Sequence, residues 1–217
     1  MTMTKLSLIC IVFWNLGCLC HAISWSLKTK PAVFGKDIEL NCTLDGAPTD
    51  KTRQWSKGEN VNVVVVNGKT INDTKYVEKF NEATRSSVLT IKSMDIDDVN
   101  IPYTCHYGFN QYRDILNMTI ENYEYHPVGS DSFFLFHHNS TELLLTMVFD
   151  KVYPVPKCSA FYGETNVSDK LTMASVPNNE FFNVGISLHY RHISTDCVHH
   201  ALDLVCFVGT KKNLSTF

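Results

Sequence analysis

Histidine is the side chain best suited to proton transfer and metal binding near neutral pH, and this chain has nine. Side chains that are adjacent or three residues apart on an extended strand point to opposite faces, so they cannot converge on one ion. We therefore interpret the close histidine pairs as solvated surface residues and predict no metal site. These pairs are His137-His138, His189 with His192, and His199-His200.

Acidic and nucleophilic side chains also lack the spacing that catalysis or calcium binding requires. Ser, His and Asp occur, but the sequence has no His-Glu-x-x-His, no Gly-x-Ser-x-Gly and no phosphate-binding glycine loop. Asp95, Asp97 and Asp98 lie close together, yet a calcium loop needs more oxygen ligands and a sharp glycine turn. We interpret the three aspartates as a solvated loop and predict a protein that is not an enzyme and has no cofactor.

Residues 1–22 have the pattern of a secretory signal peptide. Lys5 precedes an apolar stretch from Leu6 to Leu19, and the small residue Ala22 follows. This pattern predicts cleavage after Ala22, with Cys20 as the alternative. A membrane anchor is the other interpretation, but the apolar stretch is shorter than the roughly 20 residues of a helical span.

Cysteine chemistry depends on that assignment, because three of the eight cysteines lie within residues 1–22. An exported chain permits disulfide bonds. An odd number leaves one thiol free or paired between chains, so the count allows a disulfide-linked or non-covalent dimer. The five cysteines that remain are Cys42, Cys105, Cys158, Cys197 and Cys206.

Charge and glycosylation motifs both indicate an extracellular product. The net charge of −3 and the absence of a Lys/Arg stripe argue against a nucleic-acid partner. No segment after residue 22 has the length and apolarity of a membrane span, and the polar end KKNLSTF offers no signal for a lipid anchor. Six Asn-x-Ser/Thr motifs predict N-glycosylation, at Asn41, Asn72, Asn117, Asn139, Asn166 and Asn213.

Short alternating segments separated by turns predict an all-β protein. In residues 38–44, apolar side chains alternate with polar ones, and Asn67-Gly68 ends the β-branched run Val61 to Val66, which predicts a hairpin with a type I′ turn. A cluster of Asn, Pro, Gly and Ser in residues 121–130 predicts a domain boundary. The other strands are predicted at residues 88–91, 103–107, 113–120, 133–136, 142–149, 157–162, 184–192 and 202–208, with Leu116, Met118 and Ile120 on one side of the strand 113–120.

The stretch from Gly35 to Tyr107 resembles the immunoglobulin superfamily. Cys42, Trp55 and Cys105 have the order and spacing of the cysteines and core tryptophan of a variable-type domain, and Tyr103 stands at the position of the family's corner tyrosine. The resemblance implies a β-sandwich with a Cys42–Cys105 disulfide between its sheets and Trp55 packed against it. It also places Leu40, Leu89 and Ile91 in the core with Tyr103.

One residue departs from the family pattern. The aspartate that usually precedes the corner tyrosine by four residues is here five residues before it, as Asp98, and Pro102 stands directly ahead of the tyrosine. For that reason we do not predict the ion pair between Arg85 and Asp98 that the resemblance would otherwise imply.

Residues 145–162 are similar to the second and third strands of constant-type immunoglobulin domains, with Tyr153 to Pro156 as the turn between them. Met147 takes the position of the usual first cysteine, so the common bridge between sheets cannot form. The resemblance implies that Cys158 lies beside Cys206 in one sheet. Cys158–Cys206 is therefore the preferred pair, and Cys158–Cys197 is the alternative. A β domain of another family is the alternative for this half of the chain.

The segment from Tyr107 to Tyr112 is the candidate ligand-binding loop, with Tyr107, Phe109, Asn110 and Tyr112 as its contact residues. Loops rich in Tyr, Asn and Gly suit adaptable recognition, although an ordinary hairpin is the alternative. Asn41 and Asn117 are predicted to point outward from opposite sheets, so that both flat faces carry sugar and partners bind at loops or an edge.

The fold class predicted from these features is all-β, with two tandem immunoglobulin-like sandwiches. Their predicted ranges are 23–122 for a variable-like domain and 127–217 for a divergent constant-like domain. The family resemblance implies a secreted or cell-surface protein that binds an extracellular protein or glycan in adhesion or immune defence. The alternatives are a soluble decoy of a membrane receptor and, with less support, a secreted enzyme with an immunoglobulin-like appendage.

Overall fold

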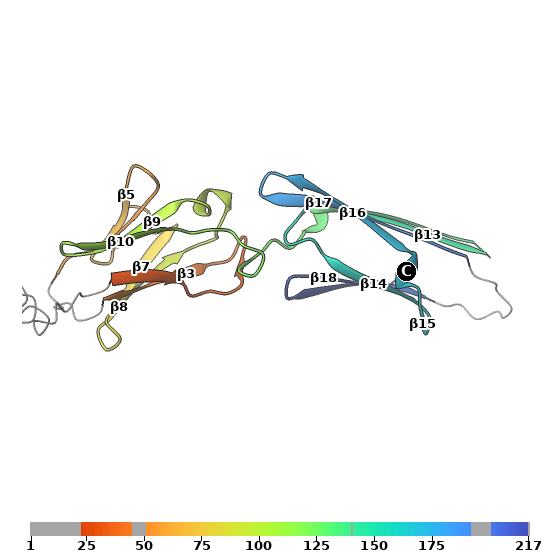
Figure 1. The fold of residues 1–217 in the computed structure, drawn as a ribbon, viewed down its shortest axis with the longest axis horizontal. Coiled ribbons are helices and arrows are strands. Elements are labelled where there is room, and N and C mark those ends of the chain that lie inside the picture. The colour runs from red at the N-terminus through yellow and green to blue at the C-terminus, as the bar shows by residue number, and fades with distance from the viewer. Residues whose placement is uncertain (1–22, 45–50, 140, 192–200, 217) are drawn as a thin grey trace, which may run out of the picture.

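The structure, a computed structural model, describes residues 23–44, 51–139, 141–191 and 201–216. Within these ranges the chain forms strands and three single 3₁₀ turns, which confirms the all-β prediction. Figure 1 shows two sandwiches placed end to end, each made of two sheets. The 3₁₀ turns are Ile96–Asp98, Gly129–Asp131 and Ser168–Lys170.

The N-terminal sandwich packs a four-stranded antiparallel sheet against a five-stranded one. Alternation sets its inward face, because β3 (Ile38–Leu44) buries every second residue. The first sheet has the order β1-β3-β8-β7, with β1 (Ile23–Leu27), β8 (Ser86–Ile91) and β7 (Tyr76–Asn81). The second has the order β10-β9-β4-β5-β6, with β10 (Asn110–Ile115), β9 (Pro102–Tyr107), β4 (Arg53–Lys57), β5 (Asn62–Val66) and β6 (Lys69–Thr70).

The hairpin between β5 and β6 turns at Asn67-Gly68, as predicted. Asn67 has φ 46° and Gly68 has φ 78°, the positive values that a type I′ turn requires at both positions. Asparagine and glycine tolerate this backbone conformation better than other residues.

The predicted strand from Arg113 to Ile120 is wrong in its placement. The strand β10 ends at Ile115, and Leu116 leaves the sheet and exchanges backbone hydrogen bonds with Ile101 and Asn100 instead. Ile120 is consequently 67% exposed and does not share a buried face with Leu116. The chain then returns to the sandwich as β11 (Tyr123–Glu124), which pairs in parallel with β2 (Ala32–Val33).

The C-terminal sandwich has two four-stranded antiparallel sheets. Three of its strands, β15, β16 and β19, were not predicted from the sequence. One sheet has the order β12-β13-β17-β16, with β12 (Ser132–His138), β13 (Glu142–Val152), β17 (Phe181–Arg191) and β16 (Leu171–Asn178). The other has the order β15-β14-β18-β19, with β15 (Thr165–Asn166), β14 (Lys157–Tyr162), β18 (Leu202–Val208) and β19 (Lys211–Thr216).

A disulfide bond joins Cys158 in β14 to Cys206 in β18, which are paired neighbours in one sheet with Cα atoms 4.1 Å apart. The alternative partner, Cys197, lies outside the described residues. Met147 is buried where a constant-type domain would carry its first cysteine, and Ala160 is buried in β14. The two sheets of this sandwich are therefore held by apolar packing.

Aromatic side chains fill the junction between the sandwiches. Phe34, Tyr125 and Phe181 contact one another with ring centroids 5.1 to 6.0 Å apart, and Lys151 Nζ lies 4.2 Å from the Phe181 ring centroid. The backbone of Tyr125 also exchanges two hydrogen bonds with Tyr153, at 2.7 and 3.2 Å. Because Phe34 comes from the first sandwich and Phe181 from the second, these contacts couple the two bodies.

A buried carboxylate adds a polar contact to the same junction. Glu124 is 3% exposed, and its side chain accepts hydrogen bonds from the backbone N–H and the hydroxyl of Thr210, at 2.7 and 3.1 Å. His126 Nε2 lies 2.6 Å from the same carboxylate. Gly209 makes this approach feasible, because a Cβ at that position would overlap the Glu124 carboxylate.

We predict that Gly209→Ala destabilises the chain more than Gly68→Ala. Both glycines have positive φ, which costs about 1 kcal/mol for alanine. A Cβ at Gly68 meets open space, whereas at Gly209 it overlaps Glu124, which adds about 1–3 kcal/mol. Differential scanning calorimetry of the two variants tests this prediction, and equal shifts in their unfolding free energy would contradict it.

Candidate recognition surface

The centre of the N-terminal sandwich is the disulfide bond between Cys42 in β3 and Cys105 in β9. Trp55 is paired with Cys105 across β4 and β9, and its side chain is fully buried. A second indole, which sequence reasoning missed, lies on the other side: Trp25 is paired with Cys42 across β1 and β3. Trp25 Nε1 donates a hydrogen bond of 2.9 Å to the backbone carbonyl of Tyr103. The remaining predicted core residues Leu40, Leu89 and Ile91 are fully buried around this centre.

The indole N–H of Trp55 begins a buried series of hydrogen bonds that the sequence did not indicate. It donates to Ser87 Oγ at 2.8 Å, and Ser87 Oγ donates to Glu78 Oε1 at 2.6 Å. The side chain of Glu78 is 1% exposed and is paired with Arg53 Nε at 3.1 Å. The other carboxylate oxygen of Glu78 accepts a hydrogen bond from the Gly68 N–H at 2.6 Å, so this series of hydrogen bonds reaches the β5–β6 hairpin. Each of these buried side chains has a hydrogen-bond partner, which is the condition for burying a polar group at low cost.

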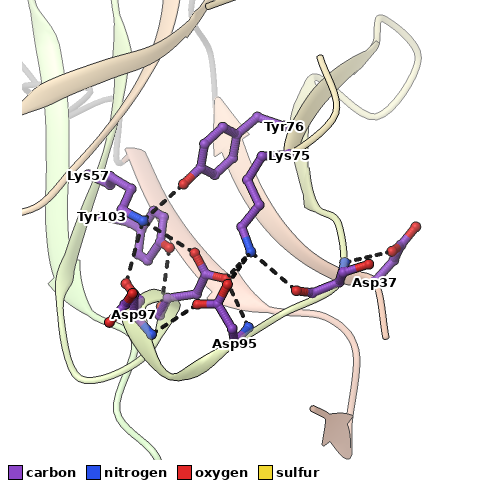
Figure 2. Close-up of polar contacts among 9 residues, drawn as sticks. Asp37, Lys57, Lys75, Tyr76, Asp95, Asp97 and Tyr103 are labelled. Carbon is purple, nitrogen blue, oxygen red and sulfur yellow. Dashed lines mark hydrogen bonds and ion pairs between the residues drawn. The ribbon is translucent and has the colours of Figure 1, made fainter. Parts of the chain in front are cut away.

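Asp98 forms a second buried cluster, and the interpretation of all three aspartates as solvated is wrong for this residue. Asp98 is fully buried, whereas the Asp95 side chain is 58% exposed. Figure 2 shows Lys57 and Lys75 converging on this loop. Lys57 Nζ lies 3.2 Å from Asp98 Oδ1, and Lys75 Nζ is paired with Oδ2. The carboxylate thus takes its partners from the end of β4 and from the residue directly before β7, and these partners are lysines in place of the arginine of the family pattern.

The corner tyrosine closes the same cluster. Tyr103 Oη donates to the backbone carbonyl of Asp98 at 3.2 Å, and burial raises the pKa of Tyr103 far above its usual value. Burial alone would lower the pKa of Lys57, but its hydrogen bond to Tyr76 and the charge of Asp98 outweigh burial and raise that pKa. The pKa of Lys75 is raised for the same reason, through Asp98 and Asp95. The lysines are therefore charged at neutral pH and hold the loop that precedes β9.

The candidate loop is a tight hairpin between β9 and β10. Gly108 has φ 58°, and its N–H donates to the Thr52 carbonyl at 2.9 Å. This hydrogen bond fixes the turn against the segment that precedes β4. Phe109 is completely exposed and Asn110 is also exposed. Tyr107 is 3% exposed and Tyr112 is packed against the core, so these two predicted contact residues support the turn from below. Of the four predicted residues, Phe109 and Asn110 are therefore the exposed ones.

A polar strip extends from this turn across the outer face of the sheet. Gln111, His106 and Gln54 form one row over β10, β9 and β4, on the face opposite to Trp55. Burial lowers the pKa of His106, so its ring is neutral at pH 7. The ring lies 3.3 Å from Ser56 Oγ in the next row. The strip therefore offers amide and imidazole groups that form hydrogen bonds without carrying charge.

The glycosylation motifs leave this strip open. Asn41 points outward from β3 in the opposite sheet, and Asn72 is exposed in the turn before β7. Asn117 is exposed but lies beyond the end of β10, so the prediction that it projects from a strand of this sheet is wrong. The other motifs belong to the C-terminal sandwich, with Asn139 after β12, Asn166 in β15 and Asn213 in β19.

The described parts of the chain contain neither a cluster of metal ligands nor a membrane-spanning helix. No group of three or more His, Cys, Asp or Glu side chains there is arranged to hold a metal ion. His137, His138 and His189 are exposed on strands, whereas His192, His199 and His200 lie outside the described residues. No helix in the described ranges has the length and apolarity to cross a membrane.

The features described so far define a class, a pair of β-sandwiches of which the first has a cross-sheet disulfide flanked by tryptophan. Two solved structures identify it as the immunoglobulin fold. The mouse nectin-like molecule 4 ectodomain (Ig1–Ig3) matches 85% of this chain with a TM-score of 0.64 at 11% identity, and the chain spans 63% of it. Bovine butyrophilin matches 90% with a TM-score of 0.58 at 16% identity, over 97% of its own length. No protein-family model and no curated protein matches the sequence.

We predict that Asp98→Asn lowers the unfolding free energy of the N-terminal sandwich by about 3 kcal/mol, because it leaves two partly buried lysines without their carboxylate. The matched control is Asp95→Asn in the same loop. This residue is mostly exposed, so its pair with Lys75 should be worth less than about 1 kcal/mol. Chemical denaturation followed by tryptophan fluorescence measures both effects. A control variant as unstable as Asp98→Asn would contradict the assignment.

Proposed function

We propose that this chain is an extracellular recognition protein that binds a protein ligand through the β9–β10 turn and the polar strip beside it. The observation that carries the proposal is Phe109, a large aromatic side chain held in solvent at the tip of a short, hydrogen-bonded turn. Exposed aromatic residues on rigid supports are the usual energetic centres of protein interfaces.

The position of the turn supports this assignment. The turn between β9 and β10 lies at the end of the N-terminal sandwich that is farther from the junction (Figure 1). Gln111, His106 and Gln54 adjoin it with uncharged hydrogen-bonding groups, and none of the glycosylation motifs lies on that strip. An aromatic anchor next to a polar, unglycosylated surface fits the arrangement of a protein-binding site.

An extracellular location is part of the same proposal. Two disulfide bonds in a chain of this size favour an oxidising compartment. The leader-like residues 1–22 and the six glycosylation motifs agree with export. One of the similar structures, that of mouse nectin-like molecule 4, is an ectodomain, and its fold likeness to this chain supports a recognition role by analogy.

We predict that Phe109→Ala weakens ligand binding about 30-fold, as expected when an aromatic anchor worth about 2 kcal/mol is removed. The chain from residue 23, biotinylated and tetramerised on streptavidin, serves as the probe for staining cells of the source organism. Flow cytometry with increasing probe concentration measures the apparent affinity, and protease treatment of the cells should abolish staining if the ligand is a protein.

The control for this experiment is Ile120→Ala, which removes an exposed apolar side chain at the other end of the same domain. It should stain cells like the unmodified probe. If Phe109→Ala stains equally well, the turn is not the binding site, and if staining survives protease but not deglycosylation of the cells, the ligand is a glycan.

A further inference from the structure

The outer face of the sheet β12-β13-β17-β16 is unusually apolar for a surface of this molecule. Leu135 and Phe133 on β12 are 61% and 52% exposed, and Val176 on β16 is 62% exposed. This sheet is the upper layer of the C-terminal sandwich in Figure 1, with its outer face turned away from β14 and β18. An exposed group of large apolar side chains on one face indicates an interaction surface.

Strand register arranges this outer face in rows with a gradient of side-chain size. The first row runs across the sheet from Phe133 through Val148 and Gly185 to Ala174. The second row runs from Leu135 through Thr146 and Ser187 to Thr172. In both rows the bulky apolar residue is on β12 at one edge, and the small residues are on β17 and β16 at the other.

A shallow hollow lies over the edge with the small residues. Its lining includes Thr146, Thr172, Ala174, Gly185 and Ser187, together with their chain neighbours Met173 and Ile186. Gly185 contributes to its depth, since a Cβ at that position would meet no atom within 4 Å. One face therefore carries both a ridge, formed by Phe133 and Leu135, and a hollow that could receive such a ridge.

We propose that this outer face binds the same face of a second copy of the chain in a two-fold symmetric dimer. A two-fold axis parallel to the strands, between two stacked sheets, places β12 of one copy over β16 of the other. Phe133 then faces Ala174, Val148 faces Gly185 and Leu135 faces Thr172, each contact occurring twice. Ridge meets hollow on both sides, which is the self-complementarity that an isologous interface requires.

Charge and glycosylation are consistent with a second copy as the occupant. Neither the first nor the second row contains a charged side chain, so two identical faces can meet there without repulsion between like charges. The charged pair Glu142–Arg191 lies at the end of the face and is already satisfied internally at 2.9 Å. Asn166 and Asn213 are on the opposite sheet, and Asn139 is in the turn after β12, so no glycosylation motif lies within the two rows.

The size of the face sets the strength of the dimer. Four strands spaced about 4.8 Å apart, with about seven residues each, make a face of roughly 450 Å² per copy. The two copies then bury roughly 900 Å² together, below the roughly 1,600 Å² of a standard interface. We therefore expect a reversible dimer with a dissociation constant in the micromolar range.

Sedimentation velocity of the chain from residue 23 tests the dimer, with Cys197→Ser present in every sample to exclude disulfide-linked species. We expect a monomer–dimer equilibrium between about 1 and about 100 μM, and Leu135→Glu should raise the dissociation constant at least about tenfold. The control is Phe207→Glu, an apolar residue of comparable exposure on the outer face of the opposite sheet. It should leave the equilibrium unchanged.

Cysteine cross-linking tests the proposed pairing of strands. In the Cys197→Ser background, the double substitution Phe133→Cys with Ala174→Cys should give a disulfide-linked dimer under mild oxidation, whereas Phe133→Cys alone should not, because the two copies of that residue lie at opposite edges. A chain that stays monomeric at about 100 μM, a dimer unaffected by Leu135→Glu, or cross-linking by Phe133→Cys alone would each overturn the proposal.

Discussion

The bond between Cys42 and Cys105 determines how the rest of the N-terminal sandwich is built. It fixes the spacing of the two sheets, with Trp55 paired beside Cys105 and Trp25 paired beside Cys42. A buried indole needs an acceptor for its N–H, and Ser87 supplies it for Trp55. That hydroxyl in turn donates to Glu78, whose buried charge requires Arg53. Each buried group thus requires the next hydrogen-bond partner, and the series runs from the hydrophobic centre to Arg53, whose side chain is partly exposed.

The C-terminal sandwich holds its two sheets together without a disulfide bond between them. Its disulfide joins Cys158 and Cys206 on adjacent strands, so it stiffens one sheet and leaves sheet-to-sheet adhesion to apolar residues such as Met147. Apolar packing is less directional than a covalent bridge, and its strength depends on how well the side chains fill the space. The two domains therefore share a fold and differ in what holds their layers together.

Local patterns were enough to predict most strands and the Asn67-Gly68 turn, because alternation and turn chemistry are properties of neighbouring residues. The strand β16 was missed because it is an edge strand in which every residue after Leu171 is exposed, so that it shows no alternation. The burial of Asp98 and Glu78 was missed for another reason. Their partners Lys57 and Arg53 lie 41 and 25 residues away, and a charge appears solvated in sequence until the fold supplies its counterion.

The aromatic junction has a consequence for attachment to a surface. Phe34, Tyr125 and Phe181 couple the sandwiches, so the distal turn and the outer face of the second sandwich keep a defined relation to each other. Two chains joined through that outer face would hold their two tips at a set separation. If one tip of such a dimer bound its ligand, the other would be confined near neighbouring ligands at a high effective concentration. Weak contacts of the two tips would then combine into a long-lived attachment, and the coupling between the sandwiches would set which ligand spacings can be bridged.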